Sequence, residues 1–470
     1  METLFEQWAG EPCLEKDTVS AHGSARSYYR LKGPSHACMA AVNSDIRENE
    51  AFFYYTDFFR SKGIHVPEIY AISADRTTYL QQDLGNQTLY DFVCARRHEG
   101  ADFQQTVEPV YRKVIDGLVA LQKAGATADF SHAYPRPAFD RQSMQWDLNY
   151  FKYDFLKLAH IPFDEQLLET DFDTFIGQIE AVPHQFFMYR DFQSRNIMLS
   201  GSDIYFIDYQ GGRQGAPHYD LASLLYDAKA EIPDDARLRL ADYYYQAFGD
   251  DLGQTRQQFG QTLRRFVLLR IMQAFGAYGY RGLFEGKEHF VHSIAPALGN
   301  MVNVLNDNSL LADCPELERV LKLMVASDEL RRISCAAAAK GQLTVTVNSF
   351  SFKRGYPYDK NGNGGGFVFD CRALPNPGRY PQYRQYTGND QPVIDFLQKE
   401  PEVEQFVNAA FAIVRKSVER YIQRGFENLQ VNFGCTGGQH RSVYCAEQLA
   451  KKIGQIAGCT VQVHHLEQER

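Results

Sequence analysis

The stretch MYRDFQSRNIMLSGSDIYFIDYQ, residues 188–210, contains two short apolar runs, IML and IYFI, on either side of SGSD. The apolar runs are typical of strands and SGSD is typical of a turn, so the stretch predicts a β-hairpin. Asn196 and Asp208 are equally distant along the chain from residue 202, inside the turn. Because opposed residues on antiparallel strands have Cβ atoms about 5 Å apart, we expect these two side chains to face each other.

The residue types in this stretch suit phosphoryl transfer. An amide oxygen and a carboxylate at such a distance can bind one magnesium ion. Asp191 precedes Asn196 by five residues, in the loop that enters the hairpin, where a carboxylate can accept the proton of an attacking hydroxyl. Alternatively, Asp191 and Asn196 only cap turns. The preceding Arg190, the hairpin and the terminal IDYQ favour the catalytic interpretation.

The residues before this stretch predict two different regions. SYYRL, ACMAAV and TYLQQDL, between Ser24 and Leu84, alternate like strands, and SDIRENEAFFYYTDFFRSKG between the last two is a helix pattern. Ser44 is a good N-cap for that helix and Gly63 a good end. From Thr88 to about Arg332 the pattern is mostly long amphipathic helices. We therefore expect a small antiparallel sheet with one helix, followed by a helical region.

The C-terminal part predicts a separate unit. LTVTVNSFSF and LQVNFGC are strand patterns, and the second, expected to be the last strand, is followed by a helix pattern. Strand and helix therefore alternate as in an α/β unit, for which we expect residues 341–470. The segment RRISCAAAAKGQ, residues 331–342, separates it from the helical region, with a boundary near 335–341.

Composition excludes several classes of protein. The 470 residues are too many for one core and are 44% hydrophobic and 23% charged, as in folded proteins. The start METLFEQWAGE resembles no signal peptide and no apolar run is long enough to span a membrane, so we expect a cytoplasmic protein. Nine scattered cysteines without a CxxC pair fit neither a disulfide framework nor a zinc site. The net charge of −9 makes a nucleic-acid partner unexpected, although residues 341–470 hold 15 basic against 12 acidic residues.

The stretch YRDFQSRN followed by IDYQ resembles the catalytic and metal-binding loops of the aminoglycoside phosphotransferase family, over roughly residues 1–330. GSARSYYRL, GIHVPEIYA and IDYQGGRQGAPHYDLASLL are similar, in order, to text of the bacterial anomeric kinases for N-acetylmuramate and N-acetylglucosamine. The resemblance implies an α+β bilobal fold like that of protein kinases. Residues 1–87 would form the β-rich N-lobe and residues 88–335 the helical C-lobe.

The resemblance also implies roles for particular residues. Asp191, with Arg190, would be catalytic, and Asn196 and Asp208 would hold Mg²⁺. ATP or GTP would lie between the loop at Gly23 and Ser24 and a hinge at 81–85 that includes Gln82 and Leu84. The implied acceptor is an amino sugar, in peptidoglycan recycling. The pattern of the family is broken in ACMAAVN, which lacks the lysine that pairs with the phosphates. Arg30 or a residue from elsewhere would replace it, with Glu48 or Glu50 as the ion-pair partner.

Three segments combine aromatic with polar residues and are candidates for the acceptor site: 146–154, 211–220 and 270–282. Among their residues we expect Asp147 and Arg213 to contact the acceptor. Asp220 is expected to brace the catalytic loop instead of reacting.

The loop GCTGGQHRS, residues 434–442, connects a strand pattern to a helix pattern. Adjacent glycines let backbone amides converge on an anion, and the helix N-terminus adds partial positive charge. The predicted phosphate cradle comprises Cys435, Thr436, Gly437, Gly438, Gln439, His440, Arg441 and Ser442, with His440 and Arg441 completing the clamp. The spacing from Cys435 to Arg441 also matches the C-x5-R loop of cysteine phosphatases, which leaves that activity as an alternative.

SFSFKRGYP, FDCRALPNP, YTGND and GCTGGQHRSVYCAEQLA resemble, in order, the C-terminal domain of the RapZ family. That family senses glucosamine-6-phosphate, and its full-length members hand a small regulatory RNA to a nuclease. The resemblance implies a sugar-phosphate receptor with Lys353, Asp370 and Arg372 near the cradle. The ending HHLEQER has no strongly basic tail, so RNA binding is not expected. Together the two resemblances indicate an amino-sugar kinase with a phosphosugar sensor. A regulatory pseudokinase and an antibiotic phosphotransferase remain the alternatives.

Overall fold

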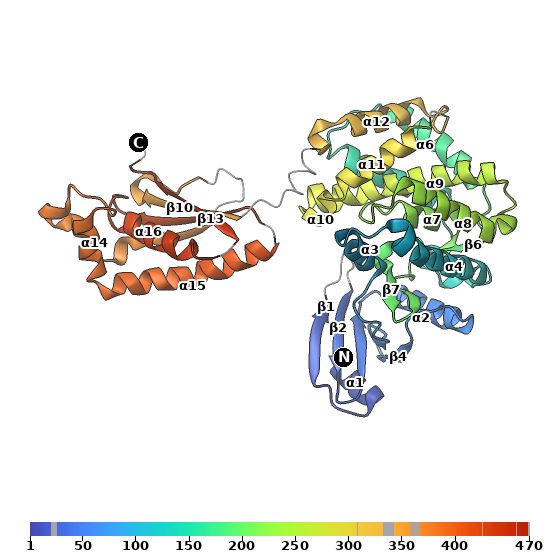
Figure 1. Cartoon of the computed structure of the whole chain (residues 1–470), viewed down its shortest axis with the longest axis horizontal. Helices are drawn as coiled ribbons and strands as arrows, with labels where there is room; N and C mark the ends of the chain where they lie inside the picture. The colour runs from blue at the N-terminus through green and yellow to red at the C-terminus, as the bar shows by residue number, and fades with distance from the viewer. Residues whose placement is uncertain are drawn as a thin grey trace. The chain divides into compact units, whose positions relative to one another are not determined.

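The computed structural model describes residues 1–19, 26–307, 309–331, 343–358, 366–424, 426–456 and 458–468. The predicted linker from residue 332 to 342 therefore lies outside the described residues. The chain divides into two compact units, Met1–Cys335 and Ala336–Arg470 (Figure 1). Each unit has a hydrophobic core of its own, and each is described separately.

The first unit begins with a five-stranded antiparallel sheet in the order β1-β2-β3-β5-β4. The strands are β1 (Glu15–Val19), β2 (Ser27–Lys32), β3 (Ala37–Val42), β4 (Ile69–Ile72) and β5 (Thr78–Gln81). The sequence predicted β2, β3 and β5 but not the outer strands. β1 is a charged edge strand with mostly exposed residues, and β4 has only four residues, so neither shows a clear alternation of polar and apolar residues.

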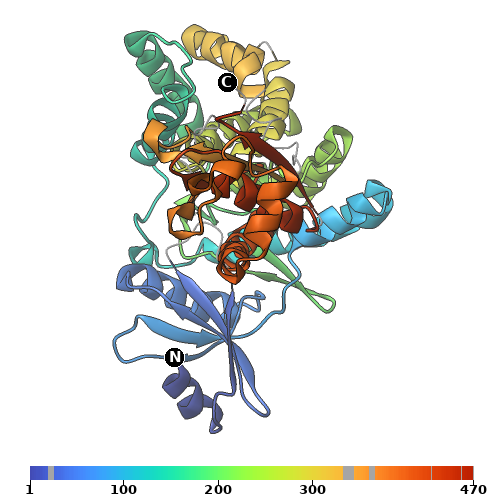
Figure 2. The same cartoon turned by 90° about the vertical axis from the view of Figure 1, so that its left-hand side faces the viewer.

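Two helices cover the two faces of this sheet. The helix α2 (Ile46–Ser61) packs Phe52 and Tyr55 into the main core of the unit. The helix α1 (Glu2–Ala9) packs Phe5 against the opposite face, at the end of the sheet seen at the bottom of Figure 2. The predicted N-cap of α2, Ser44, is wrong by one residue: the side chain of Asp45 accepts a hydrogen bond from the backbone of the third residue of the helix.

The rest of the first unit is mainly helical, as the sequence indicated. The α-helices are α3 (Leu89–His98), α4 (Glu108–Gly125), α5 (Arg141–Phe151), α6 (Glu165–Glu180), α7 (His218–Leu225), α8 (Asp234–Leu252), α9 (Arg256–Ala277), α10 (Glu288–Val291), α11 (Ile294–Leu305) and α12 (Pro315–Ala326). Three π-helical segments, η1 (Phe103–Val107), η3 (Lys152–Leu156) and η5 (Tyr278–Phe284), adjoin α4, α5 and α9. Among the described residues, every helix is too short or too polar to cross a bilayer.

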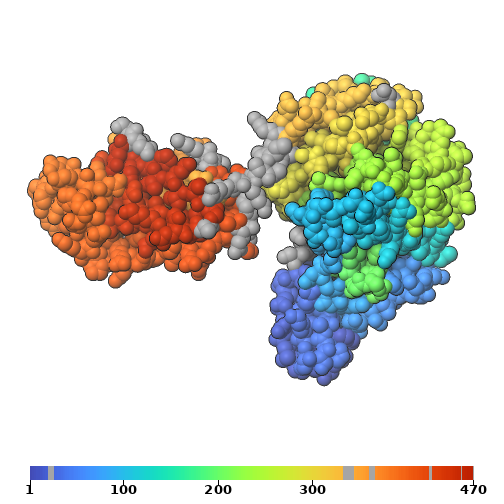
Figure 3. All heavy atoms as spheres, viewed as in Figure 1, coloured from blue at the N-terminus to red at the C-terminus, as the bar shows by residue number. Residues whose placement is uncertain are grey.

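Two short antiparallel strand pairs lie within this helical region. β6 (Phe186–Met188) pairs with β9 (Arg213–Gly215), and β7 (Ile197–Ser200) pairs with β8 (Asp203–Phe206). The β7–β8 hairpin lies at the surface between α3 and the N-terminal sheet (Figure 3). Backbone bonds attach it to Gln87, just before α3, and to His65, in the loop between α2 and β4. The expected hairpin therefore sits at the junction of the two lobes.

The second unit is a parallel sheet in the order β11-β12-β10-β13. Its elements are β10 (Leu343–Ser351), β11 (Phe367–Asp370), α14 (Gln391–Gln398), α15 (Pro401–Arg424), β12 (Asn428–Cys435), α16 (Arg441–Ile453) and β13 (Cys459–His465). The sequence missed β13 and wrongly took β12 as the last strand. Because β13 is an edge strand of half-exposed residues, its composition does not mark it. The fold class, a bilobal α+β unit followed by an α/β unit, is confirmed.

Candidate active site

The hairpin brings Asn196 and Asp208 together, although not by the expected register. Ile197 pairs with Phe206, and the backbone of Ile207 bonds the carbonyl of Asn196, so Asp208 lies one residue beyond the position opposite Asn196. The side chains still meet, with Asn196 Nδ2 at 3.3 Å from Asp208 Oδ2. Asp208 has a φ of 70°, a rare left-handed conformation for a non-glycine residue that is typical of functional sites.

Asp191 lies at the entrance of the hairpin with its carboxylate accessible. Its side chain is 48% exposed and forms an ion pair with Arg270, with Nη2 at 3.8 Å from Asp191 Oδ1. The backbone carbonyl of Asp191, not the carboxylate, holds the loop in place: it accepts bonds from Asn196 Nδ2 at 2.8 Å and from the backbone of Gln193. The carboxylate is therefore available to an acceptor hydroxyl.

The backbone before Asp191 is fixed from its buried side by Asp220. The Asp220 carboxylate accepts hydrogen bonds from the backbone amides of Tyr189 and Arg190, at 2.8 and 3.0 Å, and from Gln122. Burial raises the pKa of Asp220 to about 7. Arg190 has a φ of 83°, and these bonds hold its left-handed backbone in place. The expected bracing role of Asp220 is confirmed.

Two expected site residues, Arg190 and Asp147, bind each other. Arg190 Nη1 and Nη2 donate to the two oxygens of Asp147 at 2.6 and 2.5 Å, and Arg190 Nη1 also donates to Tyr219 at 2.8 Å. Both oxygens of Asp147 are occupied and the residue is buried, so the expectation that it contacts the acceptor is wrong. Arg190 anchors the catalytic loop to α5 and is a positioning residue.

Arg213 is also turned toward the protein. Its Nε and Nη2 both donate to the carbonyl of Gly211, at 3.0 and 2.9 Å, and the side chain is buried. Burial, together with the nearby charge of Arg190, lowers the pKa of Arg213 to about 10. The expectation that Arg213 contacts the acceptor is therefore wrong, because its guanidinium closes the turn before β9.

The surroundings of Asp208 suit a divalent cation. Burial, together with the nearby carboxylates of Asp191 and Glu48, raises the pKa of Asp208 to about 6, although a hydrogen bond from Gln210 acts in the opposite direction. Carboxylates gathered in a buried site favour a bound cation. Among the described residues, no three His, Cys, Asp or Glu side chains form a metal site. A magnesium ion here would have Asn196 and Asp208 as protein ligands and would depend on phosphate oxygens for others.

On the nucleotide side, two expected residues point elsewhere. Arg30 donates to both oxygens of Asp83, at 2.6 and 2.9 Å, and to Asn86 at 2.8 Å, so it ties β2 to the segment after β5. Glu50 forms an ion pair with Arg76 at the surface. These bonds disfavour Arg30 as the cation at the phosphates and Glu50 as its ion-pair partner, because both side chains are engaged with other residues.

Glu48 and Arg26 take the place expected for that ion pair. Arg26 Nη2 lies 3.6 Å from Glu48 Oε1, and the guanidinium lies over the ring of Phe52. Gln210 links Glu48, at 3.4 Å, to Asp208, at 2.7 Å. The sequence named Glu48 as one of two candidates but missed Arg26, which directly precedes β2. The sequence signal that could have pointed to Arg26 was the absence of a lysine in β3, since another cation then had to replace it.

The remaining nucleotide-side residues belong to the hinge and to the loop before β2. The backbone of Gln82 bonds the carbonyl of Glu68 at 2.8 Å, and Leu84 is buried. Gly23 and Ser24 lie outside the described residues.

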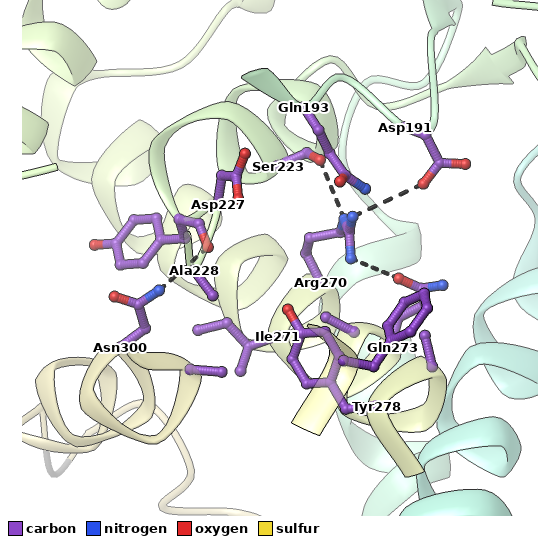
Figure 4. A pocket seen from close by; sticks show the side chains of 15 residues that line it. Asp191, Gln193, Ser223, Asp227, Ala228, Arg270, Ile271, Gln273, Tyr278 and Asn300 are labelled. Atoms are coloured by element: carbon purple, nitrogen blue, oxygen red, sulfur yellow. Dashed lines mark hydrogen bonds and ion pairs between the residues drawn. The ribbon is translucent and has the colours of Figure 1, made fainter. Parts of the chain in front are cut away.

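A cavity of about 150 Å³ opens beside Asp191 (Figure 4). Its lining comprises Asp191, Gln193, Ser223, Tyr226, Asp227, Ala228, Arg270, Ile271, Gln273, Ala274, Ala277, Tyr278, Phe290, Ala297 and Asn300. Of the three candidate segments, only 270–282 contributes to it. Asp227 and Asn300 were not predicted from the sequence, although Asp227 ends the run YDLASLLYD. A mixture of apolar and polar side chains next to the carboxylate suits a small hydroxylated acceptor.

In the second unit, the predicted cradle lies between β12 and α16. Cys435 Sγ receives the amide of Gly438 at 3.2 Å and contacts the hydroxyl of Ser442 at 3.2 Å. Burial raises the pKa of the thiol, but the bonds from Ser442 and Gly438 outweigh this and leave the pKa below its usual value. Thr436, Gly437 and Gln439 are exposed at the top of the loop. Two groups of the loop that could bind an anion, the Gly438 amide and the Ser442 hydroxyl, therefore contact the thiol of Cys435 instead.

The expected clamp by His440 and Arg441 is not formed. Arg441 is buried, and its Nη1 donates to the carbonyls of Arg372 and Leu374 at 2.8 and 3.0 Å. The ring of His440 lies 3.2 Å from the carbonyl of Tyr383. These bonds make Arg441 a tether of the turn after β11.

The expected neighbours of the cradle lie near the carboxyl ends of β10 and β11. Lys353 is exposed just after β10. Arg372 pairs with Asp370 and lies over the ring of Phe352. Exposed basic groups are therefore present at the same edge of the sheet as the cradle loop.

Comparison with known families separates the same two parts of the chain. Residues 19–257 match the phosphotransferase enzyme family, and residues 343–469 match the RapZ C-terminal domain. Both domain resemblances are confirmed at this level.

Similar curated proteins match about a third of the chain or less. A nucleotide-binding protein of Verminephrobacter eiseniae is 38% identical over 159 residues, 32% of this chain and 51% of that protein. One from Halorhodospira halophila is 43% identical over 132 residues, 28% of this chain and 44% of that protein. The chain thus spans about half the length of the curated relatives it matches.

Similar solved structures cover the first unit. A thermostable mutant of aminoglycoside phosphotransferase APH(4)-Ia is 16% identical and covers 66% of this chain and 99% of its own, with a TM-score of 0.43. The Plasmodium vivax ethanolamine kinase is 12% identical and covers 62% and 82%, with a TM-score of 0.45.

Proposed function

Because the chain belongs to the phosphotransferase enzyme family, we propose that its first unit transfers a phosphoryl group from ATP or GTP to a hydroxyl of an amino sugar. The proposed acceptors are N-acetylmuramate and N-acetylglucosamine, as in peptidoglycan recycling. One observation supports this most directly: an exposed carboxylate, Asp191, lines a cavity of mixed polar and apolar side chains, and its backbone carbonyl is bonded by Asn196, which also contacts Asp208.

The arrangement supports a simple transfer. The acceptor hydroxyl, in the cavity, gives its proton to Asp191 as its oxygen bonds the γ-phosphorus. The bond from that phosphorus to the bridging oxygen breaks and leaves the nucleoside diphosphate. Asn196 and Asp208 would hold Mg²⁺, which neutralises phosphate charge when bound. Arg26, held by Glu48, supplies the positive charge that the absent lysine would have given.

The direct test is turnover of ATP and GTP with a panel of amino sugars. We expect phosphorylated product from N-acetylmuramate or N-acetylglucosamine, detected by mass spectrometry. Nucleotide and sugar binding without product would instead indicate a regulatory pseudokinase, and product only from aminoglycosides would indicate an antibiotic phosphotransferase.

We propose that the second unit binds a sugar phosphate, with glucosamine-6-phosphate as the first candidate. The loop at the N-terminus of the 13-residue helix α16 has exposed residues at its top, and Lys353 lies at the same edge of the sheet. A phosphatase role for Cys435 is less well supported, because Arg441 bonds backbone carbonyls.

Replacing Gly437 with Asp is expected to weaken glucosamine-6-phosphate binding by about tenfold or more, because it puts a negative charge at the phosphate end of α16. A side chain at Gly437 meets nothing within 4 Å, so the fold should tolerate it. Isothermal titration calorimetry measures the effect. Gly454→Asp, at the other end of α16, gives the same change in charge and should bind normally. Equal affinities of both variants would argue against a cradle at this loop.

A further inference from the structure

Arg270, in α9, brings a buried positive charge to the wall of the cavity. The residue is 9% exposed. Its Nε donates to the hydroxyl of Ser223 at 3.1 Å, and its Nη1 donates to the side-chain oxygen of Gln273 at 2.6 Å. Its Nη2 faces Asp191 at 3.8 Å. Figure 4 shows the guanidinium between these three side chains. Two of its nitrogens therefore bond neutral groups, and the third faces the catalytic carboxylate.

The charge of Arg270 is not closely neutralised by the protein. Within the part of the chain that the structure describes, Asp191 is the only carboxylate within 4.0 Å of this guanidinium. Arg190, which is half-buried, shows the contrast, because both of its Nη atoms bond the carboxylate of Asp147. A buried charge is costly unless it is paired and hydrogen-bonded. An anionic ligand in the cavity would supply the missing partner.

The other acidic group of the cavity is already engaged. Asp227 Oδ2 accepts a bond from the backbone of Ser194 at 3.2 Å, and Oδ1 accepts one from the backbone of Lys229 at 3.2 Å. Asp191 must remain free to take a proton from the acceptor. Arg270 is therefore the charged side chain of the cavity that is best placed to bind a negatively charged substituent of the acceptor.

We propose that the acceptor carries a carboxylate, that Arg270 binds this carboxylate in the cavity, and that Arg270 disfavours cationic acceptors. This inference rests on the proposed function and narrows it to anionic sugars. Arg270 Nη2 is close to Asp191, so the carboxylate lies near the hydroxyl that is phosphorylated. The cavity also offers an apolar surface to the ring of the sugar. This surface comes from three residues of α9 spaced about one turn apart: Ile271, Ala274 and Ala277.

The test compares two acceptors that differ by one carboxylate. N-acetylmuramate carries a lactyl carboxylate that N-acetylglucosamine lacks, and kanamycin serves as a polycationic acceptor. In the wild type, kcat/KM should favour the acid by about tenfold or more. Arg270→Gln should reduce this preference by roughly 10- to 100-fold, mainly through the KM of the acid, because a charge-assisted bond is lost. Arg270→Lys should retain part of the preference.

A matched control lies on the same helix. Arg264 is exposed and pairs with Asp307, so Arg264→Gln removes the same charge away from the cavity and should leave the preference unchanged. An equal loss on both sugars in Arg270→Gln would overturn the inference, because Arg270 would then act on Asp191 or on the transferred phosphoryl group. A wild type that prefers the neutral sugar or kanamycin would overturn it without any variant.

Failure of the proposed function can be separated from failure of this inference. If neither sugar is phosphorylated, the amino-sugar kinase proposal fails, but calorimetric titration of both sugars into the full chain still tests the role of Arg270. Tighter binding of the acid that depends on Arg270 would support the inference. Equal binding of the two sugars, or no binding of the acid, would overturn it.

Discussion

Replacing Asp191 with Asn is expected to lower kcat by about 10³-fold while nucleotide affinity changes by less than about threefold. The amide of Asn cannot take the proton of the acceptor hydroxyl, so the step that forms the oxygen–phosphorus bond loses its base. The fold of the loop should be retained, because the bonds that hold it are made by the backbone carbonyl of Asp191 and by Asp220. Product formation from the best amino-sugar acceptor measures the effect, and fluorescent nucleotide titration checks binding.

The same substitution elsewhere in the hairpin provides the control. Asp203 begins β8 and is exposed, so Asp203→Asn removes an equal charge away from the cavity and should retain wild-type activity. Residual activity above about a tenth of wild type in Asp191→Asn would mean that Asp191 is not the base. Loss of nucleotide binding in the same variant would point to a structural role.

The parts that the sequence predicted well depend on local information. The β7–β8 hairpin follows from four turn residues and two short apolar runs, all within the 23 residues of 188–210. Such contacts are decided by neighbours in the chain. The one-residue error in the facing of Asn196 and Asp208 arose because Ser200 pairs with Asp203, which centres the turn between residues 201 and 202 and not on residue 202.

The parts that the sequence missed depend on pairs that are distant in the chain. Arg190 and Asp147 are 43 residues apart, and Arg30 and Asp83 are 53 apart. A charged residue in a motif can bind either a substrate or another side chain. The sequence alone therefore could not show that these residues form ion pairs with each other. The cavity could not be predicted for the same reason. Its lining residues are spread from residue 191 to residue 300, so no local sequence pattern identifies it.

Arg26 shows how a missing residue can be found once the contacts are known. The sequence lacks a lysine in β3 and offered Arg30 as one replacement, but Arg30 is held by Asp83 and Asn86. Arg26 directly precedes β2. Because side chains alternate between the two faces of a strand, Arg26 lies on the same side as Arg30. It is 3% exposed and connects through Glu48 and Gln210 to Asp208. Its position therefore links the helix α2 to the proposed magnesium ligand.

Replacing Arg26 with Met is expected to lower kcat/KM for ATP by about 100-fold or more, because the positive charge facing the phosphates is lost while an unbranched apolar stem is retained. A series of adenosine, ADP and ATP separates this role from general damage to the fold. In the wild type each phosphate should add affinity. In Arg26→Met that gain should largely disappear, while adenosine binds as before, and Arg26→Lys should restore part of it.

Arg30→Met is the informative comparison, because Arg30 is a neighbouring arginine of β2 whose partners lie in the hinge segment. Its loss should weaken adenosine and ATP by the same factor, since the hinge would contact the base and not the phosphates. If instead Arg30→Met removes the gain from phosphate and Arg26→Met does not, the cation of this site is Arg30 and the contact of Arg26 with Glu48 is structural. If both variants keep the gain, the phosphates are neutralised by magnesium and other groups without either arginine.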